Sequence, residues 1–343
     1  MTGRLHVLVP FWGLAGGVIK VLDYADHGRR AGMAVTLWAP EEVPADDPLL
    51  STLPVLDRLL SGGVEHRLLA SLDSDHVDTS DVVLFTEPAH AALIDRLSIP
   101  PERVVHLVQG TRHATPTWNG GLHYRLLHRP YVRIAVSEKV RDAIAPHVHP
   151  ALPLHLVPEG HDIDYFEVER PPIDPHQTIR VLYSTWKSDL GDRVAALCED
   201  DGFAFTPMRT PKSWPQLANH YRSTDIFLGC PGPEEGFYLP GLEAMAAGCV
   251  VVMALVGGNE AYAQDGVNMI ACAYDDAQGH AAALRALAND SQLRTSLALA
   301  GRATARSHHR DSERVLAQRV LREPLGNYDE AIAIGEPSTQ GAT

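Results

Sequence analysis

The sequence is poor in cysteine and has no closely spaced cysteine pair. Its four cysteines lie far apart in a chain of 343 residues, at Cys198, Cys230, Cys249 and Cys272. Isolated thiols in mostly apolar surroundings are typical of reduced, buried cysteines in a cytoplasmic protein, and they argue against a disulfide framework. Because no Cys-x-x-Cys motif is present, we expect no zinc site.

Positive charge and long hydrophobic runs are also scarce. There are 29 Lys and Arg against 43 Asp and Glu, which gives a formal net charge of -14, and no basic patch stands out. A nucleic-acid partner would need such a patch, so we expect none. No apolar stretch reaches the roughly 20 residues that cross a bilayer. The apolar run after Arg4 looks like a secretory signal, but Pro10 and two glycines interrupt it, which favours a first strand and its loop. Peripheral contact with a membrane surface stays open.

What the sequence does contain is a repeated alternation of strand, loop and helix. Residues 5–11 form a short apolar run, residues 13–17 a Gly-rich loop, and helical periodicity follows, which is typical of βαβ units on a parallel sheet. The alternation restarts after residues 167–177, a segment with three prolines and no periodicity. At 343 residues, of which 45% are apolar, the chain is longer than one hydrophobic core usually accommodates. We therefore expect an α/β protein with two Rossmann-like, doubly wound domains that face each other across a cleft.

The proline-rich segment also sets the expected domain boundaries. We predict an N-terminal domain at residues 1–168 and a C-terminal domain at residues 169–305. Residues 306–325 are predicted to form a helix that crosses back to the first domain. Residues 326–343 are small and polar, and we predict a disordered tail there.

The stretch PEEGFYLPGLEAMAAGCVVV, residues 233–252, combines acidic side chains with the start of a helix. Glu235 and Glu243 are separated by seven residues, and Pro240 suits the first turn of a helix. A helix start offers backbone N–H groups to an anionic ligand, while carboxylates accept hydrogen bonds from the hydroxyls of a sugar or ribose. These features together predict a sugar-nucleotide site.

This stretch resembles the E-x7-E signature of family four retaining glycosyltransferases, which have the two-domain GT-B fold. The turn VPEGHDIDYF, residues 157–166, is similar to the end of that family's first domain. GLAGG at residues 13–17 resembles its first Gly-rich loop, and residues 257–272 resemble its late donor-side loop and strand. The resemblance extends from residue 5 to about residue 320.

The resemblance implies a role for each matching residue. Glu235 would contact the transferred sugar, and Glu243 would hold the ribose. Glycine lets the backbone approach a ligand closely. The glycines that the resemblance places near the donor or the acceptor are Gly16, Gly17, Gly257 and Gly258.

Two positions depart from the family's pattern. The family has a basic pair after the first strand of the second domain, and here Lys187 and Arg193 stand six residues apart with the residue types exchanged. By analogy they would neutralise the leaving diphosphate. Gln109 stands where many relatives have a histidine that contacts the donor sugar. The Gln109-Gly110 pair is similar to a subset of the family that is associated with the transfer of rhamnose and other deoxysugars.

The resemblance implies transfer of a sugar from a nucleoside-diphosphate sugar to an acceptor, with retention of configuration. Glu235, Lys187 and Arg193 would be the catalytic residues. No divalent metal and no cofactor beyond the sugar-nucleotide co-substrate are expected, since dipoles and cations would hold the phosphates. The acceptor is left open, and a glycan, a lipid-linked or a natural-product acceptor would each fit.

Other readings of the same site stay open. A sugar-nucleotide epimerase with the GT-B fold would need no acceptor, and a non-catalytic sugar-nucleotide-binding regulator would need no turnover. A nicotinamide dehydrogenase is disfavoured because GLAGG lacks the GxGxxG spacing. His106, His113 and His123 lack a metal-ligand spacing, and we expect them to be ordinary polar residues of the fold.

Overall fold

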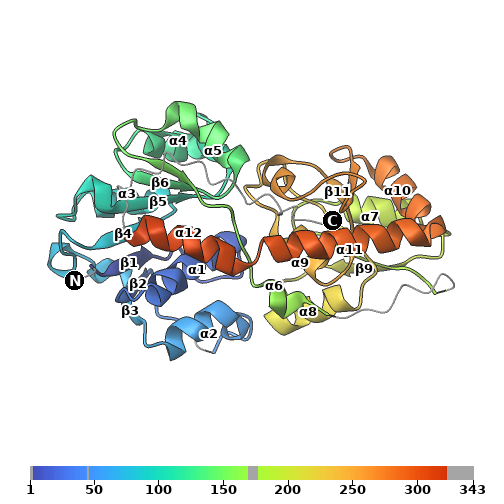
Figure 1. Cartoon of the computed structure of the whole chain (residues 1–343), viewed down its shortest axis with the longest axis horizontal. Helices are drawn as coiled ribbons and strands as arrows, with labels where there is room; N and C mark the ends of the chain where they lie inside the picture. The colour runs from blue at the N-terminus through green and yellow to red at the C-terminus, as the bar shows by residue number, and fades with distance from the viewer. Residues whose placement is uncertain (1–2, 45, 169–176, 323–343) are drawn as a thin grey trace, which may run out of the picture.

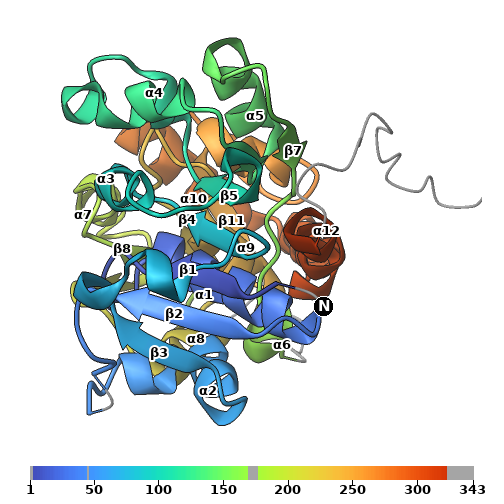
Figure 2. The same ribbon diagram turned by 90° about the vertical axis from the view of Figure 1, so that its left-hand side faces the viewer.

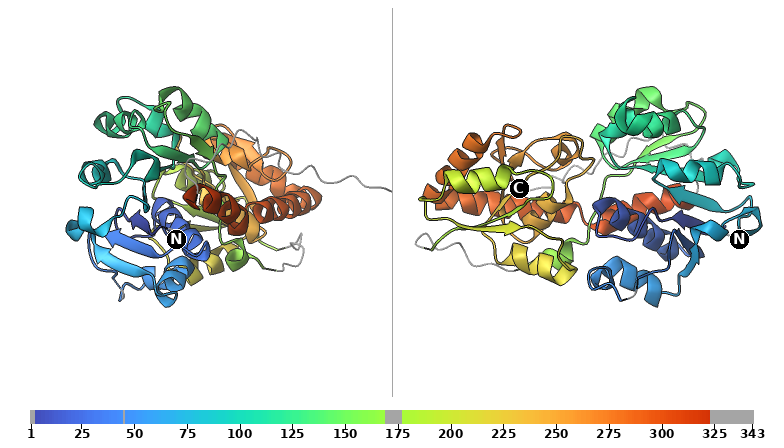
Figure 3. Two further views of the ribbon diagram at one scale, coloured as in Figure 1. Left: turned by 60° about the vertical axis from the view of Figure 1, so that its left-hand side comes forward. Right: turned by 180° about the vertical axis from the view of Figure 1, so that it is seen from behind.

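The computed structural model describes residues 3–44, 46–168 and 177–322. Two parallel sheets, each with helices around it, form two lobes (Figure 1). Figure 2 views the molecule from the end that carries the first lobe, and Figure 3 shows both lobes from two further sides. The expected α/β architecture of two doubly wound domains is confirmed.

The first domain contains a seven-stranded sheet with the order β3-β2-β1-β4-β5-β6-β7, and all neighbouring strands are parallel. The strands are β1 (Leu5–Leu8), β2 (Val35–Ala39), β3 (Glu65–Leu68), β4 (Val82–Phe85), β5 (Val104–Val108), β6 (Val132–Ala135) and β7 (Leu154–Leu156). The helices are α1 (Gly16–Arg30), α2 (Pro54–Ser61), α3 (Ala91–Ile94), α4 (Leu122–Leu127) and α5 (Glu138–Ile144). The short α6 (Ile163–Phe166) lies where the chain leaves this domain. Sheets covered on both faces bury continuous apolar strands, which explains the valine-rich runs.

The second domain contains a five-stranded parallel sheet with the order β12-β11-β10-β8-β9. Its strands are β8 (Arg180–Ser184), β9 (Ala204–Met208), β10 (Ile226–Leu228), β11 (Val250–Ala254) and β12 (Ile270–Cys272). Its helices are α7 (Leu190–Leu197), α8 (Trp214–Arg222), α9 (Leu239–Ala246), α10 (Ala277–Asn289) and α11 (Ser291–Ser307). Three cysteines are buried here and Cys272 is half-buried, all as free thiols.

The last described helix, α12 (Arg310–Arg322), returns to the first domain and packs against α1 (Figure 1). The preceding α11 packs against α9 and β11 of the second domain. The predicted domain boundary, between residues 168 and 169, falls at the edge of a segment outside the described residues. The predicted tail at residues 326–343 also lies outside them. In the described ranges, no helix is long and apolar enough to cross a membrane.

A cluster of buried charges fixes α12 on the first domain; we call it the junction cluster, and it consists of Lys20, Asp23, His27, Arg310 and Glu313. Lys20 Nζ donates to Asp23 Oδ2 and to Glu313 Oε2, both at 3.0 Å. His27 Nε2 lies 3.1 Å from Glu313 Oε2. Burial opposes the charge on Lys20, but Glu313 and Asp23 outweigh it and raise the pKa of Lys20 above its ordinary value.

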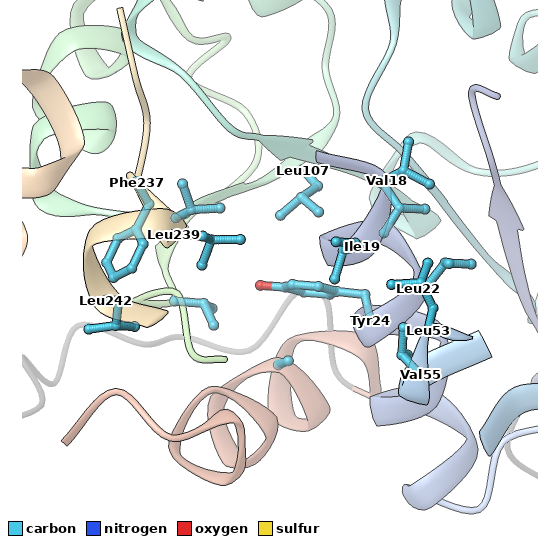
Figure 4. Close-up of a cluster of buried hydrophobic side chains, with 14 of the residues drawn as sticks. Val18, Ile19, Leu22, Tyr24, Leu53, Val55, Leu107, Phe237, Leu239 and Leu242 are labelled. Carbon is cyan, nitrogen blue, oxygen red and sulfur yellow. The ribbon is translucent and has the colours of Figure 1, made fainter. Parts of the chain in front are cut away.

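Apolar side chains join the two domains beside this cluster. The largest buried cluster includes Ile19 of α1 and Leu239 of α9, which Figure 4 shows together. The backbones also meet: a Cβ at Gly236 would lie 1.9 Å from the carbonyl oxygen of Gln109. Ser137 Oγ donates to the Gly236 carbonyl oxygen at 3.1 Å. The domains are therefore in direct contact through both side chains and main chain.

Candidate functional site

A cavity of about 520 Å³ lies between the two domains. Its walls come from loops that follow β1, β5 and β7 of the first sheet and β8, β9 and β10 of the second. Ligands of doubly wound proteins bind outside the carboxyl ends of the strands. The polar and aromatic residues that line the cavity are Gln109, Arg112, Glu159, Trp186, Lys187, Lys212, Trp214, Tyr221, Glu235, Phe237 and Glu243.

The N-terminus of α1 forms the first-domain wall of the cavity. Gly16 and Gly17 both line it and are the first two residues of this 15-residue helix. Gln109 fixes the loop, since its Nε2 donates to the Gly17 carbonyl oxygen at 3.1 Å and to Thr86 Oγ1 at 3.3 Å. A Cβ at Gly17 would lie 3.3 Å from Gln109 Oε1. The helix start therefore presents backbone amides and a positive dipole end to the cavity without intervening side chains.

Glu235 and Lys187 form an ion pair on the opposite wall. Glu235 precedes α9, and Lys187 follows β8, so two loops of the second domain bring them together. The Gly232 N–H donates to Glu235 Oε1 at 3.3 Å, and Lys187 Nζ lies 5.5 Å from the centre of the Tyr238 ring. The lysine neutralises the acid, yet both side chains remain partly exposed, so an anionic ligand can compete for the lysine.

Glu243 lies on α9 at the wall of the same cavity, but it is much more buried than Glu235. Its Oε1 lies 3.0 Å from His161 Nε2, and its Oε2 accepts a hydrogen bond from the Tyr221 hydroxyl at 2.9 Å. Each carboxylate oxygen has two acceptor sites, so these bonds leave capacity for further donors. His161 comes from the turn that leaves the first domain, so Glu243 also ties the domains together.

Three predicted site residues do not line the cavity. Arg193 on α7 is paired with Asp189, at 3.0 Å, and with Asp275, and it is not among the residues that line the cavity. Gly257 and Gly258 instead support the loop that carries Glu235. Gly257 has a φ of 50°, and the Gly258 N–H donates to the Glu235 carbonyl oxygen at 2.8 Å. Their contribution to the site is the placement of that loop.

Seven of the polar and aromatic lining residues were not predicted: Arg112, Glu159, Trp186, Lys212, Trp214, Tyr221 and Phe237. Trp186 adjoins Lys187 in sequence and is about half exposed, so a solvent-facing tryptophan beside a candidate cation was an available signal. Glu159 stands inside the turn that resembles the family's first-domain end. Arg112 and Lys212 come from loops without a recognisable motif, and the fold alone brings them to the cavity.

The cavity therefore combines three cations with three acids. Arg112, Lys187 and Lys212 can stabilise phosphate oxygens, and Glu235 and Glu243 can accept hydrogen bonds from hydroxyl groups. Lys212 Nζ donates to Thr210 Oγ1 at 3.1 Å, and the Arg112 guanidinium lies 5.0 Å from the centre of the Trp118 ring. This combination suits a ligand that carries both negative charge and hydroxyl groups.

Three buried histidines of the first domain, His106, His113 and His123, form a separate, neutral group. The His113 and His123 rings lie 4.4 Å apart, and His106 lies 5.8 Å from His113. Burial lowers the pKa of His123 to about 4 and those of the other two well below the ordinary value. Across the described residues, no group of three or more His, Cys, Asp or Glu side chains is placed to hold a metal ion.

Comparison with solved structures gives the fold its name. The chain is similar to the Anabaena protein HepE, in a crystal structure with UDP and glucose, with a TM-score of 0.69 and 16% identity over 93% of this chain and 99% of that one. This chain has the GT-B fold. Sucrose-phosphate synthase from Thermosynechococcus elongatus, another neighbour, also has a TM-score of 0.69, at 13% identity over 94% of this chain and 99% of that one.

Sequence comparisons match part of this GT-B chain. Residues 180–290, which include Glu235 and Glu243, match the family model described as glycosyl transferases group 1. A D-inositol 3-phosphate glycosyltransferase of Salinispora tropica is 33% identical over 41% of this chain and 27% of its own length. The protein of that name from Geodermatophilus obscurus is 42% identical over 21% of this chain and 16% of its own length. The matches thus span less than a third of the length of the curated relatives, and the match to the group 1 family model covers residues 180–290 of this chain.

Proposed function

We propose that this protein is a glycosyltransferase that moves a sugar from a nucleoside-diphosphate sugar to an acceptor. The observation that carries the proposal is the convergence of the α1 N-terminus, Lys187, Glu235 and Glu243 on one interdomain cavity. The group 1 domain at residues 180–290 and the UDP and glucose in the HepE structure support it.

In this proposal the charged groups divide the work by position. The α1 amides, with Lys187, Lys212 and Arg112, stabilise the diphosphate as it leaves and positive charge develops on the sugar. Glu235 binds the transferred sugar, and Glu243 accepts hydrogen bonds from the ribose. Because dipoles and cations hold the phosphates, the reaction requires no divalent metal.

The stereochemistry and the donor sugar follow from narrower arguments. We expect retention, with the departing phosphate accepting the proton of the acceptor hydroxyl at the same face. The Gln109 amide already donates to the Gly17 carbonyl oxygen and to Thr86. This supports a donor sugar, such as a deoxysugar, that needs no hydrogen bond from this position. The sequence suggested Lys187 and Arg193 as the pair of cations that neutralises the diphosphate. Because Arg193 pairs with Asp189 and Asp275, we assign this role to Lys187 and Lys212 instead.

Binding and turnover experiments test the proposal separately. UDP, TDP and GDP are each added in a thermal-shift assay, and at least one should raise the melting temperature, since a ligand selective for the folded protein stabilises it. Transfer is then followed as release of the matching nucleoside diphosphate with candidate acceptors. The variant R193A serves as a folded control outside the cavity. Indifference to all three nucleotides would contradict the proposal, and turnover without an acceptor would favour an epimerase.

A further inference from the structure

Glu159 is held at the point where the chain leaves the first domain. Its N–H donates to the Val136 carbonyl oxygen at 3.0 Å, and its own carbonyl oxygen accepts from His308 Nδ1 at 3.3 Å. The first contact ties it to the first sheet, and the second to the segment between α11 and α12. Its side chain lines the interdomain cavity and is 5% exposed. The backbone thus fixes a nearly buried carboxyl group on the cavity wall.

The Glu159 carboxyl has no hydrogen-bond partner among the described residues, which sets it apart from the two other acids of the cavity. Glu235 pairs with Lys187, and Glu243 bonds His161 and Tyr221. A buried polar group without a hydrogen bond costs free energy, and such groups in native proteins are usually hydrogen-bonded to protein, water or a ligand. For Glu159, that partner can reach it through the cavity.

The surroundings of Glu159 disfavour its ionised form. Burial is the main cause, and together with the nearby carboxylates of Glu313, Asp23 and Glu235 it raises the pKa of Glu159 to about 8, although Lys20 acts in the opposite direction. These neighbours come from α1, α12 and the loop before α9, and His308 lies on the remaining side with a lowered pKa. At neutral pH the group is therefore a carboxylic acid, which can donate a hydrogen bond.

We propose that Glu159 is a substrate-binding residue that donates its carboxyl O–H to an oxygen of the nucleotide sugar. The inference rests on the proposed function and adds a residue to its site. A neutral donor at this place serves an anionic substrate well, because an ionised Glu159 would repel the diphosphate and could no longer donate. Binding should consequently weaken when the acid loses its proton.

Calorimetric binding of UDP-glucose at about pH 6.5 and about pH 9.5 tests this, with E159Q as the isosteric neutral donor. Wild-type affinity should fall more than tenfold between the two, since a required proton is lost at about a factor of ten per pH unit above the pKa. E159Q should bind equally well at both pH values, and E159A weakly at both. E260Q changes an exposed acid that pairs with Lys139 and should behave as wild type.

The protonation state itself gives a readout without any ligand. Infrared difference spectra of the wild type should show a carboxylic acid C=O band that disappears between about pH 7 and pH 9 and is missing in E159Q. Absence of this band, or an alkaline loss of affinity that E159Q keeps, would overturn the inference. So would an E159Q variant that binds UDP-glucose normally but does not turn over at any pH, since that result assigns Glu159 as a base. A wild type with the band but no affinity for UDP, TDP or GDP would instead overturn the proposed function.

Discussion

Two lysine–glutamate pairs at the domain junction differ in their access to solvent. Lys20 and Glu313 are fully buried at 3.0 Å, and Lys20 also bonds Asp23. The side chains of Lys187 and Glu235 are 37% and 18% exposed, and they border the cavity. Both pairs join segments that are distant in the sequence, yet one is closed by protein on all sides and the other faces a space where a ligand fits.

The difference separates structural charge from functional charge. A buried pair is satisfied by fixed neighbours, and breaking it leaves an uncompensated charge in a low-dielectric interior. A pair at a cavity wall is worth little to stability, and its members can exchange one partner for another. We therefore expect the junction cluster to hold α12 on the first domain, and the Lys187–Glu235 pair to take part in ligand binding.

The largest effect on stability should come from opening the buried pair. Glu313→Ala removes the carboxylate that Lys20 and His27 share and leaves Asp23 as the side-chain hydrogen-bond partner of Lys20. It should lower the free energy of unfolding by about 3–5 kcal/mol, measured by urea denaturation. Arg314→Ala, which removes an exposed pair with Asp311 on the same helix, is the matched control. The double variant K20M/E313L should lose much less than E313A, because both members of the pair are removed together and Asp23 keeps Arg310, whose Nη2 lies 3.7 Å from Asp23 Oδ1. An equal loss in both would show that packing, rather than charge, holds α12.

Opening the Lys187–Glu235 pair at the cavity should affect turnover strongly and stability little. Glu235→Gln should lower the turnover number on the order of 100-fold, because a charged hydrogen bond to the sugar is lost, and should change the free energy of unfolding by less than about 1 kcal/mol. Steady-state kinetics and urea denaturation on the same samples provide the two values. Unchanged turnover would remove Glu235 from the reaction and leave it a structural partner of Lys187.

Glu243 stands between the two cases, since it is buried yet borders the cavity. Glu243→Ala should weaken nucleotide binding about tenfold and cost about 1–3 kcal/mol of stability, because the hydrogen bonds that this carboxylate makes with the Tyr221 hydroxyl and His161 are lost. Calorimetry with the nucleotide that gives the largest thermal shift measures the first value. A stability loss with full affinity would mean that this acid serves the domain junction alone.

The smallest effect is expected for Arg193, which the sequence placed in the site. Arg193→Ala removes exposed ion pairs with Asp189 and Asp275, so the change in unfolding free energy should stay below about 1 kcal/mol and turnover should fall less than about twofold. A large loss of turnover would restore the predicted role and require a rearrangement of α7.

The sequence predicted the features that depend on local pattern. Valine-rich runs marked the strands, and the predicted helix start after Glu235 placed that residue in the loop between β10 and α9. Gly16, Gly17, Gln109 and Lys187 lie at the cavity because each follows a strand of a parallel sheet, whose carboxyl ends share one edge.

The remaining features depend on how separate loops meet in space. Arg193 has the expected spacing from Lys187, but the turn of α7 points it toward Asp275, and spacing alone does not fix that direction. Glu159 and Arg112 come to the cavity because the domains approach each other there. The junction cluster joins α1 to a helix almost 300 residues later, and no local pattern announces such a pairing.

The main-chain contact at Gly236 sets the width of the cavity at this point. Because a Cβ there would reach within 1.9 Å of the Gln109 carbonyl oxygen, even one methyl group would act as a wedge and force the lobes apart. The spacing between the first-domain and second-domain walls is thus limited at this point by two peptide groups rather than by side chains.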